Sequence, residues 1–110
     1  MKNIKDMILK NGGATLDSNL KPIQAQKGYM VSMQGHELVT TIEGLNDTLL
    51  ENYTRLAKKL NGYVGMWLDD DKVYLDISQH HTSKNKALEV GKANKQLAIY
   101  DLENDEEIRL

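Results

Sequence analysis

The stretch from Val64 to Ile77 constrains the fold most, because apolar residues alternate with other residues on both sides of an acidic tip. If Asp70 and Asp71 form the loop of a hairpin, six apolar residues fall on one face of the paired strands. They are Val64, Met66, Leu68, Val73, Leu75 and Ile77. A slip of one residue would divide this set between the two faces. The opposite face then pairs Trp67 with Tyr74, and we expect it to be mixed in character and partly exposed.

Three segments have the spacing of amphipathic helices. Ile4, Met7 and Ile8 predict a short helix that ends at Asn11-Gly12-Gly13. The strongest pattern runs from Leu45 to Leu60, with Asn46 or Thr41 as its N-cap and Asn61-Gly62 after it as a stop.

The third helix is predicted to run to about Asn94, with Ser83 or Thr82 as its N-cap and Gly91 allowing close packing. His80 and His81, just before it, are interpreted as exposed loop residues.

Five further segments have the composition of strands. Turn residues at Gln34-Gly35 predict that two of them form a hairpin, and the acidic segment Glu103–Asp105 is the expected tip of another. The segments are Ala14–Asp17, Gly28–Met33, His36–Thr41, Leu97–Leu102 and Glu106–Leu110.

The order of these elements predicts the fold class. Strand, helix, strand, strand, helix and strand follow one another from Tyr29 to Asp101, which matches a split βαβ, ferredoxin-like core. An extra helix and strand precede this core and a hairpin ends it, so the class is α+β. The length of 110 residues predicts that residues 1–110 form a single domain.

Composition excludes several classes of function. The chain has no cysteine, which rules out disulfides, thiolate metal ligands and thiol nucleophiles. A net charge of −2 is too small for a general attraction to nucleic acid. No segment has the apolar length of a membrane span, and Met1–Lys10 mixes charged with apolar residues, unlike a signal peptide. We therefore expect a cytoplasmic protein that does not engage a membrane.

Four sequence motifs carry a resemblance that covers nearly the whole chain: "NGGATLD", "GYMVSMQGHE", "GYVGMWLDDDKVYLDIS" and "ALEVGKANKQLAIYDLENDEEI". Together they resemble a group of small uncharacterised proteins carried by bacteriophages, plasmids and other mobile elements. The resemblance implies a non-catalytic accessory protein of a bacterial host's cytoplasm that binds a host or defence protein, for example as an inhibitor of CRISPR or restriction. It implies no catalytic residue and no cofactor.

The candidate contact residues of such a protein lie around the acidic hairpin. Aromatic residues on the second face of the sheet are the expected hot spots, together with the charged tip. The set is Trp67, Tyr74, Asp69, Asp70 and Asp71. We interpret the three aspartates as a solvated turn rather than a metal site, because a calcium loop's glycine and downstream glutamate are missing. No HExxH spacing, glycine-rich phosphate loop or catalytic triad is recognisable, so we expect neither an enzyme nor a bound metal.

Two other kinds of partner remain open. The basic helix that is predicted to end near Asn94 could bind nucleic acid through Lys84, Lys86, Lys92 and Lys95, with Tyr29, Trp67 and Tyr74 exposed on the sheet for stacking on bases. A homodimer could form through a sheet edge or through the Trp67 face. The acidic stretch 101–107 fits either a basic partner, including a second copy, or a charged edge that blocks strand pairing.

Overall fold

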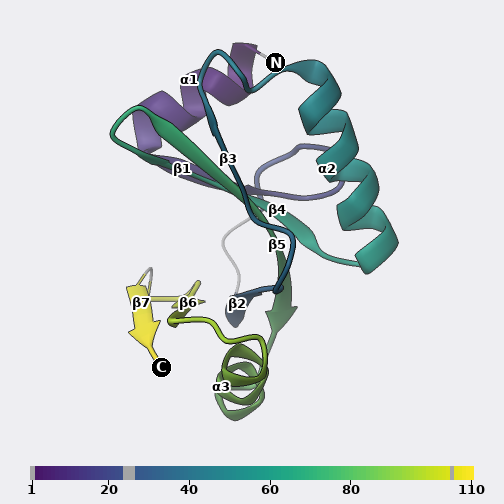
Figure 1. Ribbon diagram of the computed structural model, residues 1–110. Helices are drawn as coiled ribbons and strands as arrows, with labels where there is room; N and C mark the ends of the chain where they lie inside the picture. Colours follow the sequence, from purple (N-terminus) through teal and green to yellow (C-terminus); the bar gives the residue numbers. More distant parts are fainter. Residues whose placement is uncertain (1, 24–26, 105) are drawn as a thin grey trace.

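The computed structural model describes residues 2–23, 27–104 and 106–110, and over these residues it confirms the α+β class. Three helices accompany one seven-stranded antiparallel sheet in this part of the chain (Figure 1). The helices are α1 (Lys2–Asn11), α2 (Asp47–Leu60) and α3 (Lys84–Ala93). The strands are β1 (Gly13–Leu16), β2 (Tyr29–Ser32), β3 (Leu38–Thr41), β4 (Tyr63–Asp69), β5 (Lys72–His81), β6 (Ala98–Asp101) and β7 (Glu106–Arg109).

The β4–β5 hairpin has the predicted register. Val64 lies opposite Ile77, Met66 opposite Leu75 and Leu68 opposite Val73. Asp70 and Asp71 form the two-residue loop between Asp69 and Lys72, and Asp70 has a φ of 61°. Aspartate tolerates this left-handed conformation better than most residues, so the tip forms without a glycine.

The predicted hairpin between residues 28–33 and 36–41 is wrong. β2 and β3 do not pair with each other, and both lie antiparallel to the same side of β5. β2 pairs with Ser78–His81 and β3 with Lys72–Leu75, so the chain keeps its direction through Gln34–Glu37 instead of reversing. The long strand β5 offers both segments a complete set of partners, which outweighs the local turn signal of Gln34-Gly35.

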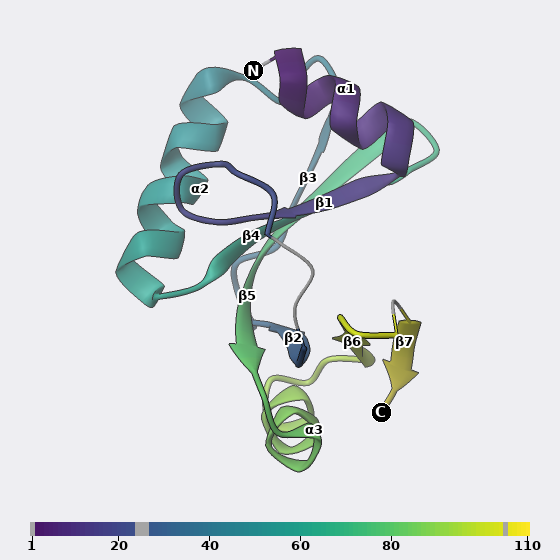
Figure 2. The same cartoon turned by 180° about the vertical axis from the view of Figure 1, so that it is seen from behind.

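The sheet has the order β1-β4-β5-β2-β6-β7, with β3 also paired to β5. β3 and β4 therefore run in the same direction on the two sides of β5, and α2 connects them (Figures 1 and 2). The predicted final hairpin is confirmed between β6 and β7, with Ile99 opposite Ile108. Asp105, expected at its tip, lies outside the described residues.

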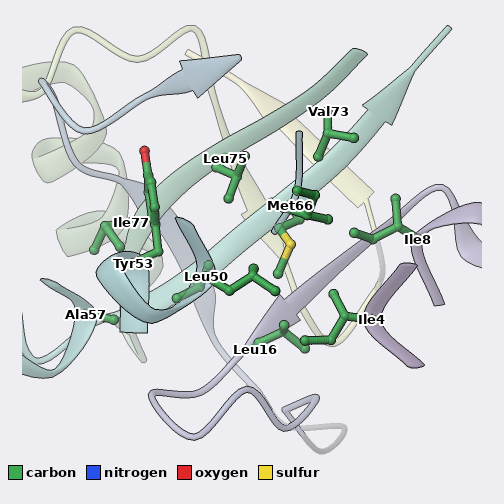
Figure 3. Close-up of a cluster of buried hydrophobic side chains, with 12 residues drawn as sticks. Ile4, Ile8, Leu16, Leu50, Tyr53, Ala57, Met66, Val73, Leu75 and Ile77 are labelled. Carbon is green, nitrogen blue, oxygen red and sulfur yellow. The ribbon is translucent and has the colours of Figure 1, made fainter. Parts of the chain in front are cut away.

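The larger core cluster lies between the β1-β4-β5 part of the sheet and helices α1 and α2 (Figure 3). It contains alternate residues of the strands, among them Met66 and Leu75, together with Ile8 of α1 and Leu50 of α2, all almost fully buried. The six apolar residues predicted for one face of the hairpin all contribute to this cluster, Leu68 as a partly buried neighbour.

The second cluster is small and lies at the other end of the sheet. Its buried members are Val31 of β2, Ala87 of α3 and Ile99 of β6. A Cβ atom on Gly91 would lie 2.9 Å from Cγ2 of Ile99 and 2.9 Å from Cδ1 of Leu110, so glycine lets α3 approach the strands closely, as predicted.

The N-caps predicted for α2 and α3 are confirmed. Asn46 accepts a hydrogen bond from the backbone N–H of Leu49 at 2.9 Å and caps α2, which ends at Asn61 in the left-handed conformation. Ser83 caps α3 in the same way, through the N–H of Lys86. None of the helices in the described ranges is long and apolar enough to cross a membrane.

Candidate functional site

One face of the sheet carries none of the three helices, and we call it the open face. Residues that alternate along a strand face opposite sides. Met66, Val73 and Leu75 face α1 and α2 in the larger cluster. The neighbours of these residues, Trp67 and Tyr74, therefore face away from the helices. Val31, which packs against α3, lies opposite Gln79 of β5, so α3 covers the same side of the sheet as α2.

The open face presents a line of three exposed residues across three neighbouring strands. Val39 of β3 lies opposite Tyr74 of β5, which lies opposite Trp67 of β4. Their exposed fractions are 54% for Val39, 40% for Tyr74 and 56% for Trp67. We call these three residues the apolar row. Sequence reasoning found its two aromatic members but missed Val39, because the predicted β2–β3 hairpin concealed the pairing of β3 with β5.

Two glycines leave Trp67 uncovered. Gly13 lies opposite Trp67 on β1, and a Cβ atom there would approach the carbonyl oxygen of Met66 to 2.8 Å. Gly65, two residues before Trp67 on the same face, has its Cβ position occupied by the carboxylate of Asp76. The position directly opposite Trp67 on β1 and the preceding position of β4 on this face therefore carry no side chain that could cover the indole, which contributes to the high exposure of a large apolar ring.

A polar cluster lies next to the apolar row on the same face. The hydroxyls of Ser32 and Ser78 each donate a hydrogen bond of 3.0 Å to the carboxylate of Asp76. Burial raises the pKa of Asp76 above its ordinary value, the two hydroxyl donors partly oppose this change, and the charge of Glu37 adds to it. Both serine hydroxyls are hydrogen-bonded to a carboxylate and not to a histidine imidazole. The cluster of Ser32, Ser78 and Asp76 therefore lacks the serine–histidine pair that activates the nucleophile in serine hydrolases.

His80 and His81 do not lie in a loop, contrary to the prediction, but end strand β5. The Nε2 atom of His80 donates a hydrogen bond of 2.8 Å to the carbonyl oxygen of Lys27, which fixes the proton on that nitrogen because a carbonyl only accepts. Burial lowers the pKa of His81, and the charge of Lys86 adds to this effect. Both histidines contribute to the lining of a shallow hollow of about 290 Å³, together with Asn61, Tyr63 and Gln79.

The acidic tip forms the turn of the hairpin, as predicted. Asp69 lies opposite Lys72, while Asp70 and Asp71 occupy the two loop positions. Asp76 lies four residues beyond Lys72 along β5, which corresponds to about 14 Å of strand. Among the described residues no three or more histidine, aspartate or glutamate side chains gather in a way that could hold a metal ion.

The basic residues proposed for nucleic acid lie apart from the apolar row. Lys84, Lys86, Lys92 and Lys95 are all exposed on α3 or just after it. α3 covers the side of the sheet opposite to the open face, and Tyr74 lies about 23 Å along β5 from the residue where that strand ends. Tyr29 packs against the small cluster beside α3 and does not join Trp67 and Tyr74.

No protein-family model matches this chain, and no curated protein or solved structure is significantly similar to it. The open face, with its apolar row, acidic tip and polar cluster, is therefore the basis of the functional argument.

Proposed function

We propose that this chain is a non-catalytic protein-binding module that contacts its partner through the apolar row. The observation that carries the proposal is the exposure of Trp67, at 56%, beside Tyr74, at 40%, in the middle of a sheet face without helices. Large aromatic side chains of this kind are enriched among the residues that contribute most to protein–protein affinity. The acidic tip next to the row supplies a charged rim that would favour a partner with basic residues around an apolar centre.

The genomic setting of this function is part of the same proposal. The resemblance of the four sequence motifs to proteins of phages, plasmids and other mobile elements supports an accessory protein in the cytoplasm of a bacterial host. In that setting the partner is a host or defence protein, and inhibition of a CRISPR or restriction system is the specific activity that we propose.

We further propose that strands β4, β5, β2 and β6 with helices α2 and α3 constitute a ferredoxin-like core. Support comes from the strand order β4-β5-β2-β6 within the sheet and from the position of both helices on one side of it. In this view α1, β1 and β7 are additions at the two ends, and the open face is the free side of the split βαβ units.

The experiment that tests the protein-binding proposal is an affinity pull-down from bacterial lysate, with and without nuclease, followed by mass spectrometry. The wild-type chain should retain a protein in near-stoichiometric amount after nuclease treatment, and Trp67→Ala and Tyr74→Ala should lose it. Leu97→Ala is the matched control, because Leu97 is 78% exposed but lies outside the open face near α3. A captured protein that both row variants retain would contradict the proposal.

The alternative function is binding of nucleic acid by α3. Its support is that Lys84, Lys86, Lys92 and Lys95 are exposed and that, within the described residues, none of them forms a salt bridge. Binding that nuclease abolishes, that weakens steeply with salt and that is lost in the Lys92→Glu/Lys95→Glu double variant would favour this alternative. The Trp67→Ala variant should bind nucleic acid normally, because the row and the helix lie on opposite sides of the sheet.

A further inference from the structure

Among the described residues three strands, β1, β7 and β3, have one outer side that pairs with no other strand of the sheet. Two of these outer sides are protected against pairing with another chain. At β1 the carbonyl oxygen of Thr15 accepts a hydrogen bond of 3.1 Å from the N–H of Ile23, and Pro22 lies against Leu16. At β7 three of the four residues are charged. Charges, proline and covering loops are the features with which proteins keep sheet edges from associating.

The third outer strand, β3, has no such protection. Its sequence, Leu-Val-Thr-Thr, contains no charge and no proline and consists of residues that favour strands. Three of its four residues are exposed, and β5 is the one element against which it packs in the described part of the chain. No other helix or strand in that part of the chain packs on its outer side, and the loop that follows β3 folds back only on its last two residues, Thr40 and Thr41.

The pairing with β5 determines which backbone N–H and C=O groups of β3 point toward β5 and which point outward. The N–H of Met33 donates a hydrogen bond of 2.8 Å to the carbonyl oxygen of Ile77, so Ile77 and every second residue of β5 direct their backbone groups toward the β2 and β3 side. Leu38 and Thr40 lie opposite two of these residues. Val39 and Thr41 therefore direct their N–H and C=O groups outward. The outward oxygen of Thr41 already accepts a bond of 3.1 Å from the N–H of Leu45, so Val39 is the residue of β3 whose outward N–H and C=O groups both lack a partner within residues 2–23, 27–104 and 106–110.

We propose that two copies of this chain pair antiparallel through β3, with the two-fold axis at Val39. A residue that lies opposite itself in an antiparallel pair exchanges two hydrogen bonds, which uses the donor and the acceptor that Val39 directs outward. The pairing joins the two sheets into one and places the two Val39 side chains next to each other on the open face. The apolar row of one copy then continues into the row of the other.

Charge favours this arrangement over association through β7. With Val39 opposite itself, Glu37 lies opposite Thr41 of the second copy, and Lys72 of the second copy is the next residue across its sheet. The Cα atoms of Glu37 and that lysine are about 10 Å apart, a distance that their long side chains can bridge. The two-fold axis repeats this pair, so two attractive contacts flank the uncharged centre.

Analytical ultracentrifugation and light scattering of the pure chain test the proposal over a wide range of protein concentration. The wild-type chain should associate reversibly into a species of two 12.5 kDa chains. Val39→Lys places two like charges on the axis and should raise the dissociation constant of the dimer at least about tenfold. Because Val39 is 54% exposed, the melting temperature extrapolated to low protein concentration should change little. Leu97→Lys, at a more exposed apolar residue away from β3, is the matched control and should leave the dimer intact.

A charge exchange gives a second readout that does not depend on the hydrogen bonds. Glu37→Lys and Lys72→Glu should each weaken the dimer, and the double variant should restore it, since the pair regains opposite charges.

A chain that remains monomeric at all concentrations would overturn the inference. So would a dimer that Val39→Lys leaves intact, or one that Trp67→Ala abolishes while Val39→Lys does not, because either result places the interface elsewhere. The pure protein is measured without any partner, so these outcomes are independent of the pull-down that tests the proposed function.

Discussion

Replacement of Trp67 by alanine separates an interaction surface from a core position. A tryptophan buries up to about 250 Å² when fully enclosed. At 56% exposure Trp67 buries less than half of this, roughly 110 Å², which corresponds to at most about 2.7 kcal/mol at about 25 cal/mol per Å². The alanine methyl and the residual burial in the unfolded chain reduce the loss, so we expect Trp67→Ala to lower the free energy of unfolding by about 1–2 kcal/mol.

The neighbouring residue provides the matched comparison. Met66 is 3% exposed and faces the larger core cluster, so Met66→Ala should cost about 2–5 kcal/mol. Urea unfolding of both variants, followed by circular dichroism, gives the two values from the same strand. In a titration of the captured partner, Trp67→Ala should weaken binding by about 2 kcal/mol or more, close to thirtyfold, whereas Met66→Ala should act mainly through stability. A loss of stability in Trp67→Ala as large as that in Met66→Ala would refute the assignment of Trp67 to an interface.

Three further predictions concern single contacts in the fold. Burial raises the pKa of Asp76 above 3.8, so the folded chain binds this proton more tightly than the unfolded chain and loses stability as the pH rises above 3.8 through the folded-state pKa. The unfolding free energy of Asp76→Asn should therefore increase relative to wild type as the pH rises over that range, and a constant difference in urea titrations would contradict this. Gly91→Ala gains about 1 kcal/mol of helix propensity but crowds Ile99 at a cost of about 1–3 kcal/mol, so the melting temperature should fall, and a rise would show that α3 can move away. Asn46→Ala removes the cap of α2 and should lower the unfolding free energy by about 1 kcal/mol, measured by urea unfolding with Asn46→Asp as the control that retains an acceptor.

Sequence reasoning succeeded where local pattern and long-range packing agree. The register of β4 and β5 was predictable because one pairing alone places all of their alternating apolar residues on one face. The caps of α2 and α3 were predictable because asparagine and serine supply the acceptor that the first helical N–H groups require.

It failed where the choice of partner depends on distant residues. Gln34-Gly35 has the composition of a hairpin turn, but β5 extends far enough to pair with the segments on both sides of it, and nothing within residues 28–41 reveals that. The same error hid Val39. The two histidines were assigned to a loop because the sequence signals the start of α3 but not the length of β5. Of the candidate site, the aromatic pair was predictable and its third member was not.

The small cluster of Val31, Ala87 and Ile99 implies that different parts of the chain differ in their resistance to opening. Within the described residues, α3, β6 and β7 pack around a cluster of three buried and four partly buried hydrophobic side chains, whereas β4 and β5 are enclosed by the larger cluster. In native-state hydrogen exchange the C-terminal unit should therefore exchange through local openings of lower free energy than those of the central hairpin. Such openings leave the strands of the apolar row in place, so the chain can lose its C-terminal order temporarily and still present Trp67 and Tyr74 in their folded geometry.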